Sequence, residues 1–174
     1  MNDRMNVDDA VIVALGSNQA LGAAGPQELL EAALSRFPAL GLNVVKRSRW
    51  WRSKAWPDET GPAFVNGVAW VETRLSPEEV MAALHGLEAE FGRVRKETNA
   101  PRTLDLDLIA YGRITTALPR GGRAPVLPHP RAHERLFVMG PLAEIAPDWR
   151  HPVNDARAAD LAEAATVGDD ARPM

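Results

Sequence analysis

The order in which strand-like and helix-like segments follow one another is the feature of this sequence that most constrains its fold. Short apolar or alternating runs indicate strands, and apolar residues that recur every three or four positions indicate helices. These patterns give a strand at 11–15, a helix at 27–37, strands at 42–52 and 64–73, a helix at 77–91 and a strand at 104–111. Strand, helix, strand, strand, helix, strand is the order of the split βαβ unit.

We therefore predict an α+β fold, a ferredoxin-like split βαβ sandwich. Its antiparallel sheet has helices packed on one face, and the other face is left for a ligand. Helices near 133–146 and 158–165 are extra C-terminal elements. The second helix has the strongest local signal, because Ser76 at the N-cap, Pro77 at the first helical position and Glu79 form a capping box.

Length and composition indicate one domain acting on small molecules. The 174 residues fit a single domain at 9–165, with flexible tails at 1–8 and 166–174 that lack an apolar period. The absence of cysteine excludes disulfides and a cysteine nucleophile. The net charge of −3 gives no general attraction to nucleic acid or to a membrane surface. No apolar run reaches the roughly 18 residues of a spanning helix, and we expect a cytoplasmic protein.

Asp105 and Asp107 are the most informative polar residues. In a strand, residues two apart point the same way, so the two carboxylates share one face with their Cα atoms about 7 Å apart. Two carboxylates this close repel one another unless they are neutralised, and Mg²⁺ with its oxygen ligands is a common neutraliser. The alternative is the polar, solvent-facing side of an ordinary edge strand.

Basic residues lie close to this acidic strand in the sequence. Arginine binds phosphate oxygens in a bidentate manner, and carboxylates for a metal beside arginines for phosphate are what a magnesium–nucleotide site requires. A solvated basic loop remains the alternative for residues 93–96. The basic and imidazole side chains are Arg93, Arg95, Lys96, Arg102, His129, Arg131 and Arg135.

Asn66 lies on a strand face with Phe64, Val68 and Trp70. A buried amide must be paired, and its donor and acceptor suit a planar heterocycle stacked on a ring. A hydrogen bond from Asn66 to a loop backbone is the alternative. On the second helix, His85 and Glu88 are three residues apart beside the buried stripe, where they border a ligand cleft or form a solvated helix edge.

Several blocks together resemble the 6-hydroxymethyl-7,8-dihydropterin pyrophosphokinase family from about Val11 to Pro147. They are Ala14-Leu15-Gly16-Ser17-Asn18, Phe64-Val65-Asn66, Gly92-Arg93-Val94-Arg95, the run from Pro101 to Asp107, Leu127-Pro128-His129-Pro130-Arg131, Glu134-Arg135 and Phe137. The resemblance implies transfer of a pyrophosphoryl group from ATP to the pterin's hydroxymethyl oxygen, with release of AMP, in folate biosynthesis. It also implies two Mg²⁺ ions and a monomer.

The same resemblance assigns roles to individual positions. Asp105 and Asp107 match the metal ligands, and with Arg95 and Arg102 they match the catalytic set. The positions that match nucleotide contacts are His85, Glu88, Arg95, Arg102, Ile109, His129 and Arg135. Those that match pterin contacts are Trp56, Phe64, Asn66 and Phe137. We expect the loops at 53–63 and 93–101 to close over both substrates and exclude water.

Two other functions fit parts of the pattern. A magnesium-dependent nucleotidyl transferase would show a similar acidic pair with arginines but would release pyrophosphate. A ferredoxin-like RNA-binding module would use aromatic residues on the open sheet face. Two carboxylates on that face would repel the phosphates of RNA, so we rank the module below the enzymes.

Overall fold

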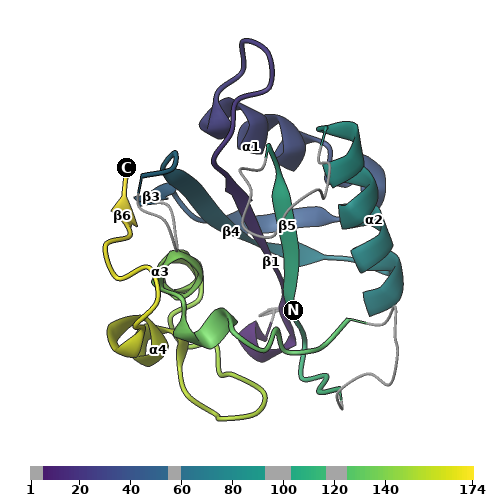
Figure 1. Ribbon diagram of the computed structural model, residues 1–174. Coiled ribbons are helices and arrows are strands. Elements are labelled where there is room, and N and C mark those ends of the chain that lie inside the picture. Colours follow the sequence, from purple (N-terminus) through teal and green to yellow (C-terminus); the bar gives the residue numbers. More distant parts are fainter. Residues whose placement is uncertain (1–5, 55–59, 93–102, 117–124) are drawn as a thin grey trace.

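The computed structural model describes residues 6–54, 60–92, 103–116 and 125–174. Within these ranges an antiparallel sheet forms in the order β5-β1-β4-β3-β6, and β2 also pairs with β4 (Figure 1). The strands are β1 (Val11–Ser17), β2 (Asn43–Arg47), β3 (Trp51–Ser53), β4 (Phe64–Glu72), β5 (Asp105–Tyr111) and β6 (Arg172–Pro173). The ferredoxin-like order predicted from the sequence is confirmed.

Two helices, α1 (Pro26–Ser35) and α2 (Pro77–Glu90), pack on one face of the sheet. The central strand β1 explains why, since its alternate residues Val11, Val13 and Leu15 join the apolar cluster beneath these helices. The capping box of α2 is confirmed: the Ser76 hydroxyl accepts from the backbone N–H of Glu79 at 3.2 Å, and the Glu79 carboxylate accepts from the backbone N–H of Ser76 at 3.4 Å.

The opposite face is covered in part by the C-terminal helices α3 (Leu136–Ile145) and α4 (Ala158–Ala164), which are the extra elements of the prediction. Together with Ile12, Val68 and Trp70 they form a second apolar cluster. This face is therefore only partly free for a ligand. Three short 3-10 turns complete the described elements: η1 (Val7–Asp9), η2 (Pro38–Leu40) and η3 (Ala132–Glu134).

The segment predicted as one strand at 42–52 is two strands, β2 and β3, both paired with β4. Between them the Ser48 hydroxyl accepts from the backbone N–H of Val68 at 2.9 Å in place of a regular ladder bond. The Trp50 ring then turns into the core over Gly67, where a Cβ would lie 2.5 Å from the ring. The bulk of this indole and the missing side chain beneath it account for the break.

Residues 166–174 differ from the predicted flexible tail, because they pack against the rest of the chain. β6 pairs with β3, and the backbone N–H of Met174 donates to the carbonyl of Trp50 at 3.0 Å. At the other end of the chain, Val7–Asp9 form a turn of helix, and the Asp8 carboxylate accepts from the backbone N–H of Arg150 at 3.2 Å. These contacts join segments far apart in sequence, which local patterns do not reveal.

In the described part of the chain, every helix is too short or too polar to cross a lipid bilayer.

Candidate active site

One row of side chains crosses the sheet on the face that carries α3. The strand register places Asp105 of β5 opposite Gly16 of β1, Gly16 opposite Asn66 of β4, and Asn66 opposite Trp51 of β3. Residues directly opposite each other in an antiparallel pair project to the same face. The predicted carboxylates and the predicted amide therefore lie on one surface, with a glycine between them.

Asp107 lies two residues further along β5, opposite Ala14. Asp105 and Asp107 are half-buried, whereas the alternate residues Leu104, Leu106 and Leu108 are buried in the core. The alternation predicted from the sequence is confirmed. Paired carboxylates on one strand face are hard oxygen donors of the kind that Mg²⁺ takes.

Among the described residues no group of three or more His, Cys, Asp or Glu side chains is arranged to hold a metal ion. The two carboxylates of Asp105 and Asp107 on one strand face suit Mg²⁺, which in nucleotide sites is held by one or two carboxylates and completes its shell with water and phosphate oxygens.

Asn66 is 9% exposed. Gly16 makes room for it, since a Cβ on Gly16 would lie 2.5 Å from the Asn66 Oδ1. A nearly buried amide offers both a donor and an acceptor and can bind the polar edge of a ligand.

His129 lies beside the acidic strand. Its backbone N–H donates to the carbonyl of Ile109 at 2.8 Å, and its Nδ1 accepts from the backbone N–H of Arg131 at 3.2 Å. Burial, followed by the charge of Arg135, lowers the pKa of His129 to about 4, although Asp105 acts in the opposite direction. His129 is thus a neutral imidazole at pH 7, with its proton on Nε2, and can donate a hydrogen bond to an anionic oxygen.

Arg135 and Phe137 lie at the start of α3. Arg135 is the N-cap residue, and its guanidinium lies 5.7 Å from the centroid of the Phe137 ring. Gly168 packs against this ring, because a Cβ on Gly168 would lie 2.5 Å from the Phe137 Cδ1. Phe137 is half-buried, with part of its surface accessible.

The remaining predicted nucleotide positions lie in different surroundings. Glu88 on α2 is 2% exposed, and its Oε2 accepts from the backbone N–H of Leu106 in β5 at 3.0 Å. His85 is exposed on the same helix, and Ile109 is buried in the second apolar cluster. Phe64, predicted to contact the pterin, is half-buried and lies opposite Ser53. Trp56, Arg95 and Arg102, and most of the loops predicted to close, lie outside the described residues.

Sequence reasoning missed three residues of this region: Trp51, Gly16 as a spacer for Asn66, and Gly168. The adjacent tryptophans Trp50 and Trp51 in a strand pattern imply rings on opposite faces, which was an available signal for Trp51. The two glycines gave no signal, because their roles depend on which distant segment lies beside them.

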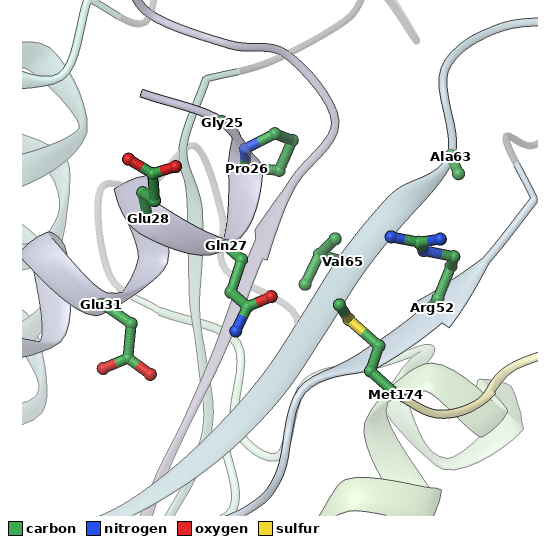
Figure 2. Close-up of a pocket in the computed structure, with 9 residues that line it drawn as sticks. All are labelled: Gly25, Pro26, Gln27, Glu28, Glu31, Arg52, Ala63, Val65 and Met174. Atoms are coloured by element: carbon green, nitrogen blue, oxygen red, sulfur yellow. The ribbon is translucent and has the colours of Figure 1, made fainter. Parts of the chain in front are cut away.

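A separate groove of about 690 Å³ lies on the α1 side of the sheet, and Figure 2 shows Arg52 and Met174 across it from the first turn of α1. It contains none of the predicted site residues that the structure describes. Its lining residues are Gly25, Pro26, Gln27, Glu28, Glu31, Arg52, Ala63, Val65 and Met174.

The fold resembles solved structures. The crystal structure of wild-type Plasmodium falciparum HPPK-DHPS matches with a TM-score of 0.66 and 11% identity, over 88% of this chain and 44% of that one. At this identity the match supports the fold alone.

Sequence comparison is more specific. The 2-amino-4-hydroxy-6-hydroxymethyldihydropteridine pyrophosphokinase of Pseudomonas aeruginosa is 42% identical over 143 residues, which cover 82% of this chain and 83% of that protein. The enzyme of the same name from Synechocystis sp. is 40% identical over 143 residues, covering 81% and 68%. Folic acid synthesis protein fol1 of Pneumocystis carinii is 35% identical over 167 residues, covering 96% of this chain and 21% of that protein.

A family model described as 7,8-dihydro-6-hydroxymethylpterin-pyrophosphokinase matches residues 12–147, a span that includes every predicted site residue. This chain therefore belongs to the 7,8-dihydro-6-hydroxymethylpterin-pyrophosphokinase family.

Proposed function

We propose that the sheet face carrying Asp105, Asp107 and Asn66 is the active site of a diphosphotransferase. The enzyme transfers the terminal diphosphate of ATP to the hydroxymethyl oxygen of 6-hydroxymethyl-7,8-dihydropterin, with release of AMP, in folate biosynthesis. The observation that carries this proposal is the juxtaposition of a carboxylate pair and a nearly buried amide on one surface of a chain of this family.

The acidic end of the row serves the nucleotide. Asp105 and Asp107 would hold two Mg²⁺ ions, which when bound neutralise charge on the phosphate oxygens. Arg95, Arg102 and Arg135 bind phosphate oxygens, and the neutral His129 donates a hydrogen bond from Nε2 without adding charge. By their match to the family's nucleotide contacts, we also assign His85, Glu88 and Ile109 to the border of the nucleotide site.

The other end of the row serves the pterin. The Asn66 amide pairs with the polar edge of the ring, and Phe137, Phe64 and Trp56 contact its faces and rim. In-line transfer needs little covalent chemistry from the protein, so the main task of these residues is to align the hydroxymethyl oxygen with the phosphorus. We further propose that the chain acts as a cytoplasmic monomer with loops 53–63 and 93–101 closing over the substrates.

The test mixes the purified protein with ATP, Mg²⁺ and 6-hydroxymethyl-7,8-dihydropterin and resolves the nucleotide products. We expect AMP only when the pterin is present, and a loss of at least about 100-fold in rate with Asp107→Ala, in the range found when one electrostatic stabiliser of a transition state is removed. Release of pyrophosphate instead would indicate a nucleotidyl transferase. An Asp105→Ala variant that stays folded and fully active would contradict the assigned metal site.

A further inference from the structure

The last nine residues, 166–174, lie outside the family match and run from the start of α3 to the end of β3. We call this segment the C-terminal strap. We propose that it positions the two sides of the pterin end of the site, and that Gly168 and Asp170 are positioning residues for pterin binding. This inference rests on the proposed function of the site.

The strap begins on the turn that leads into α3. The backbone N–H of Val167 donates to the carbonyl of Glu134 at 3.0 Å, and the backbone N–H of Leu136 donates to the carbonyl of Val167 at 2.9 Å. These bonds flank Arg135, which pairs with Val167 in a parallel bridge. The strap thereby fixes the backbone immediately before Phe137.

Gly168 then contacts the Phe137 ring directly. The residue has a φ of +66°, in the left-handed region where a side chain is strained, and a Cβ there would lie 2.5 Å and 3.0 Å from the Cδ1 and Cε1 of Phe137. The backbone of the strap thus supports this ring, and only glycine permits so close an approach. The ring's distance from the sheet face depends on this support.

Asp170 binds the end of β3, on the other side of the pterin end of the site. Its Oδ2 accepts from the backbone N–H of Lys54 at 2.7 Å, immediately after β3, and β6 continues the contact by pairing with Trp51 and Arg52. Ser53, the last residue of β3, lies opposite Phe64. The strap therefore connects the segment that carries Phe137 with the strand end beside Phe64.

The experiment measures AMP formation while one substrate is varied and the other is saturating. Gly168→Ala is expected to raise the KM for the pterin about tenfold and to change the KM for ATP by less than about twofold. Gly22→Ala is the matched control, because Gly22 also has a positive φ, +60°, but nothing lies within 4 Å of its Cβ position. It is expected to leave both KM values unchanged.

A second pair of variants tests the other attachment. Asp170→Ala is expected to raise the pterin KM several-fold. Asp170→Asn keeps an acceptor oxygen for the backbone N–H of Lys54, so its pterin KM is expected to stay at the wild-type value. Asp169→Ala, at the exposed neighbour, serves as the control.

If Gly168→Ala behaves like Gly22→Ala, or raises both KM values equally, the strap does not position the pterin and the inference fails while the proposed function stands. If the wild-type chain forms no AMP, the proposed function fails and this inference fails with it.

Discussion

Gly16 shows how a single residue's size can determine the geometry of the site. It lies between Asp105 and Asn66 in the row across the sheet, and a Cβ there would lie 2.5 Å from the Asn66 Oδ1, closer than real Cβ contacts. The backbone of Gly16 is not in the left-handed region. The requirement for glycine is therefore one of space alone.

Gly16→Ala is accordingly expected to displace the Asn66 amide and weaken pterin binding. Loss of one or two hydrogen bonds costs about 1–3 kcal/mol, so the KM for the pterin should rise roughly tenfold to hundredfold, with a smaller change for ATP. Steady-state kinetics with each substrate varied checks this. Gly86→Ala, where nothing lies within 4 Å of the Cβ position, is the control. An unchanged pterin KM in Gly16→Ala would contradict the argument.

The residues that were predicted correctly are those whose geometry is local. Asp105 and Asp107 share a face because strand alternation is a property of three consecutive residues. The spacer role of Gly16 depends instead on the register between β1 and β4, which are about 50 residues apart in the chain. The same holds for Gly168, whose partner Phe137 lies on a different element.

At the scale of elements, two adjacent tryptophans where β3 begins each attach a helix to one face of the sheet: Trp50 attaches α1 and Trp51 attaches α3. On one face the Trp50 Nε1–H donates to Glu31 of α1 at 2.8 Å, and Glu31 also binds Arg47 through two bonds of 2.7 and 2.8 Å. These bonds, above all those from Arg47, lower the pKa of Glu31 to about 2.

On the other face the Trp51 Nε1–H donates to Glu144 of α3 at 2.6 Å, and Glu144 also accepts from the backbone N–H of Arg49 at 3.1 Å. The Trp51 ring lies on Gly140, where a Cβ would lie 2.6 Å from it. The two clusters are chemically alike, but only Trp51 is a neighbour of Asn66.

This likeness gives a matched pair of variants. Glu144→Ala and Glu31→Ala each remove a carboxylate that accepts several hydrogen bonds, and each is expected to cost about 1–3 kcal/mol of unfolding free energy. Only Glu144→Ala should also raise the pterin KM, because it frees α3 and Trp51 beside Asn66. Urea denaturation and steady-state kinetics measure the two effects. Equal pterin KM values in both variants would show that α3 docking does not affect the site.

Elements whose ends carry local signals were predicted closely. The start of α2 depends on Ser76 and Glu79, three residues apart, and the capping box is present as expected. The division of one predicted strand into β2 and β3 was not predictable in this way. It depends on the Trp50 ring meeting Gly67 of the neighbouring strand, a contact that no window of the sequence contains.

At the scale of the whole molecule, the order of the elements was enough to predict the sheet and the face on which α1 and α2 pack. The cover that α3 and α4 give the other face, and the attachment of residues 166–174, follow from contacts between distant segments. The strap is held largely by backbone hydrogen bonds, which require no apolar period. A segment with the polar sequence of a loose tail is therefore held against the rest of the chain.

Between α3 and α4 in the chain lies His151, a histidine that is 6% exposed. Its Nδ1 accepts from the backbone N–H groups of Val153 and Asn154 at 3.2 and 3.3 Å, and its ring makes an edge contact with His133, with centroids 5.3 Å apart. Burial, followed by the charges of His133 and Arg113, lowers the pKa of His151 from the usual 6.5 to about 4. The folded protein therefore keeps this ring neutral.

The stability of the whole chain should consequently fall in mild acid. Above pH 6.5 His151 is neutral in both states, and between pH 6.5 and about 4 the unfolded chain gains a proton that the folded chain does not. A shift of this size lowers the free energy of unfolding by about 2 kcal/mol at pH 5, and His129, whose pKa is also lowered to about 4, adds a loss in the same direction. At pH 5 the Glu31 cluster contributes little to the change, because its carboxylate is mostly charged in both states.

His151→Asn isolates this contribution, since the Asn amide oxygen can accept the same backbone N–H groups but does not titrate. Urea denaturation at pH 7.5 and pH 5.0 should show that the variant loses about 2 kcal/mol less than the wild type between the two conditions. The comparison is made between pH values within each protein, so any packing cost of the substitution cancels. Equal losses in the two proteins would place the acid sensitivity elsewhere in the molecule.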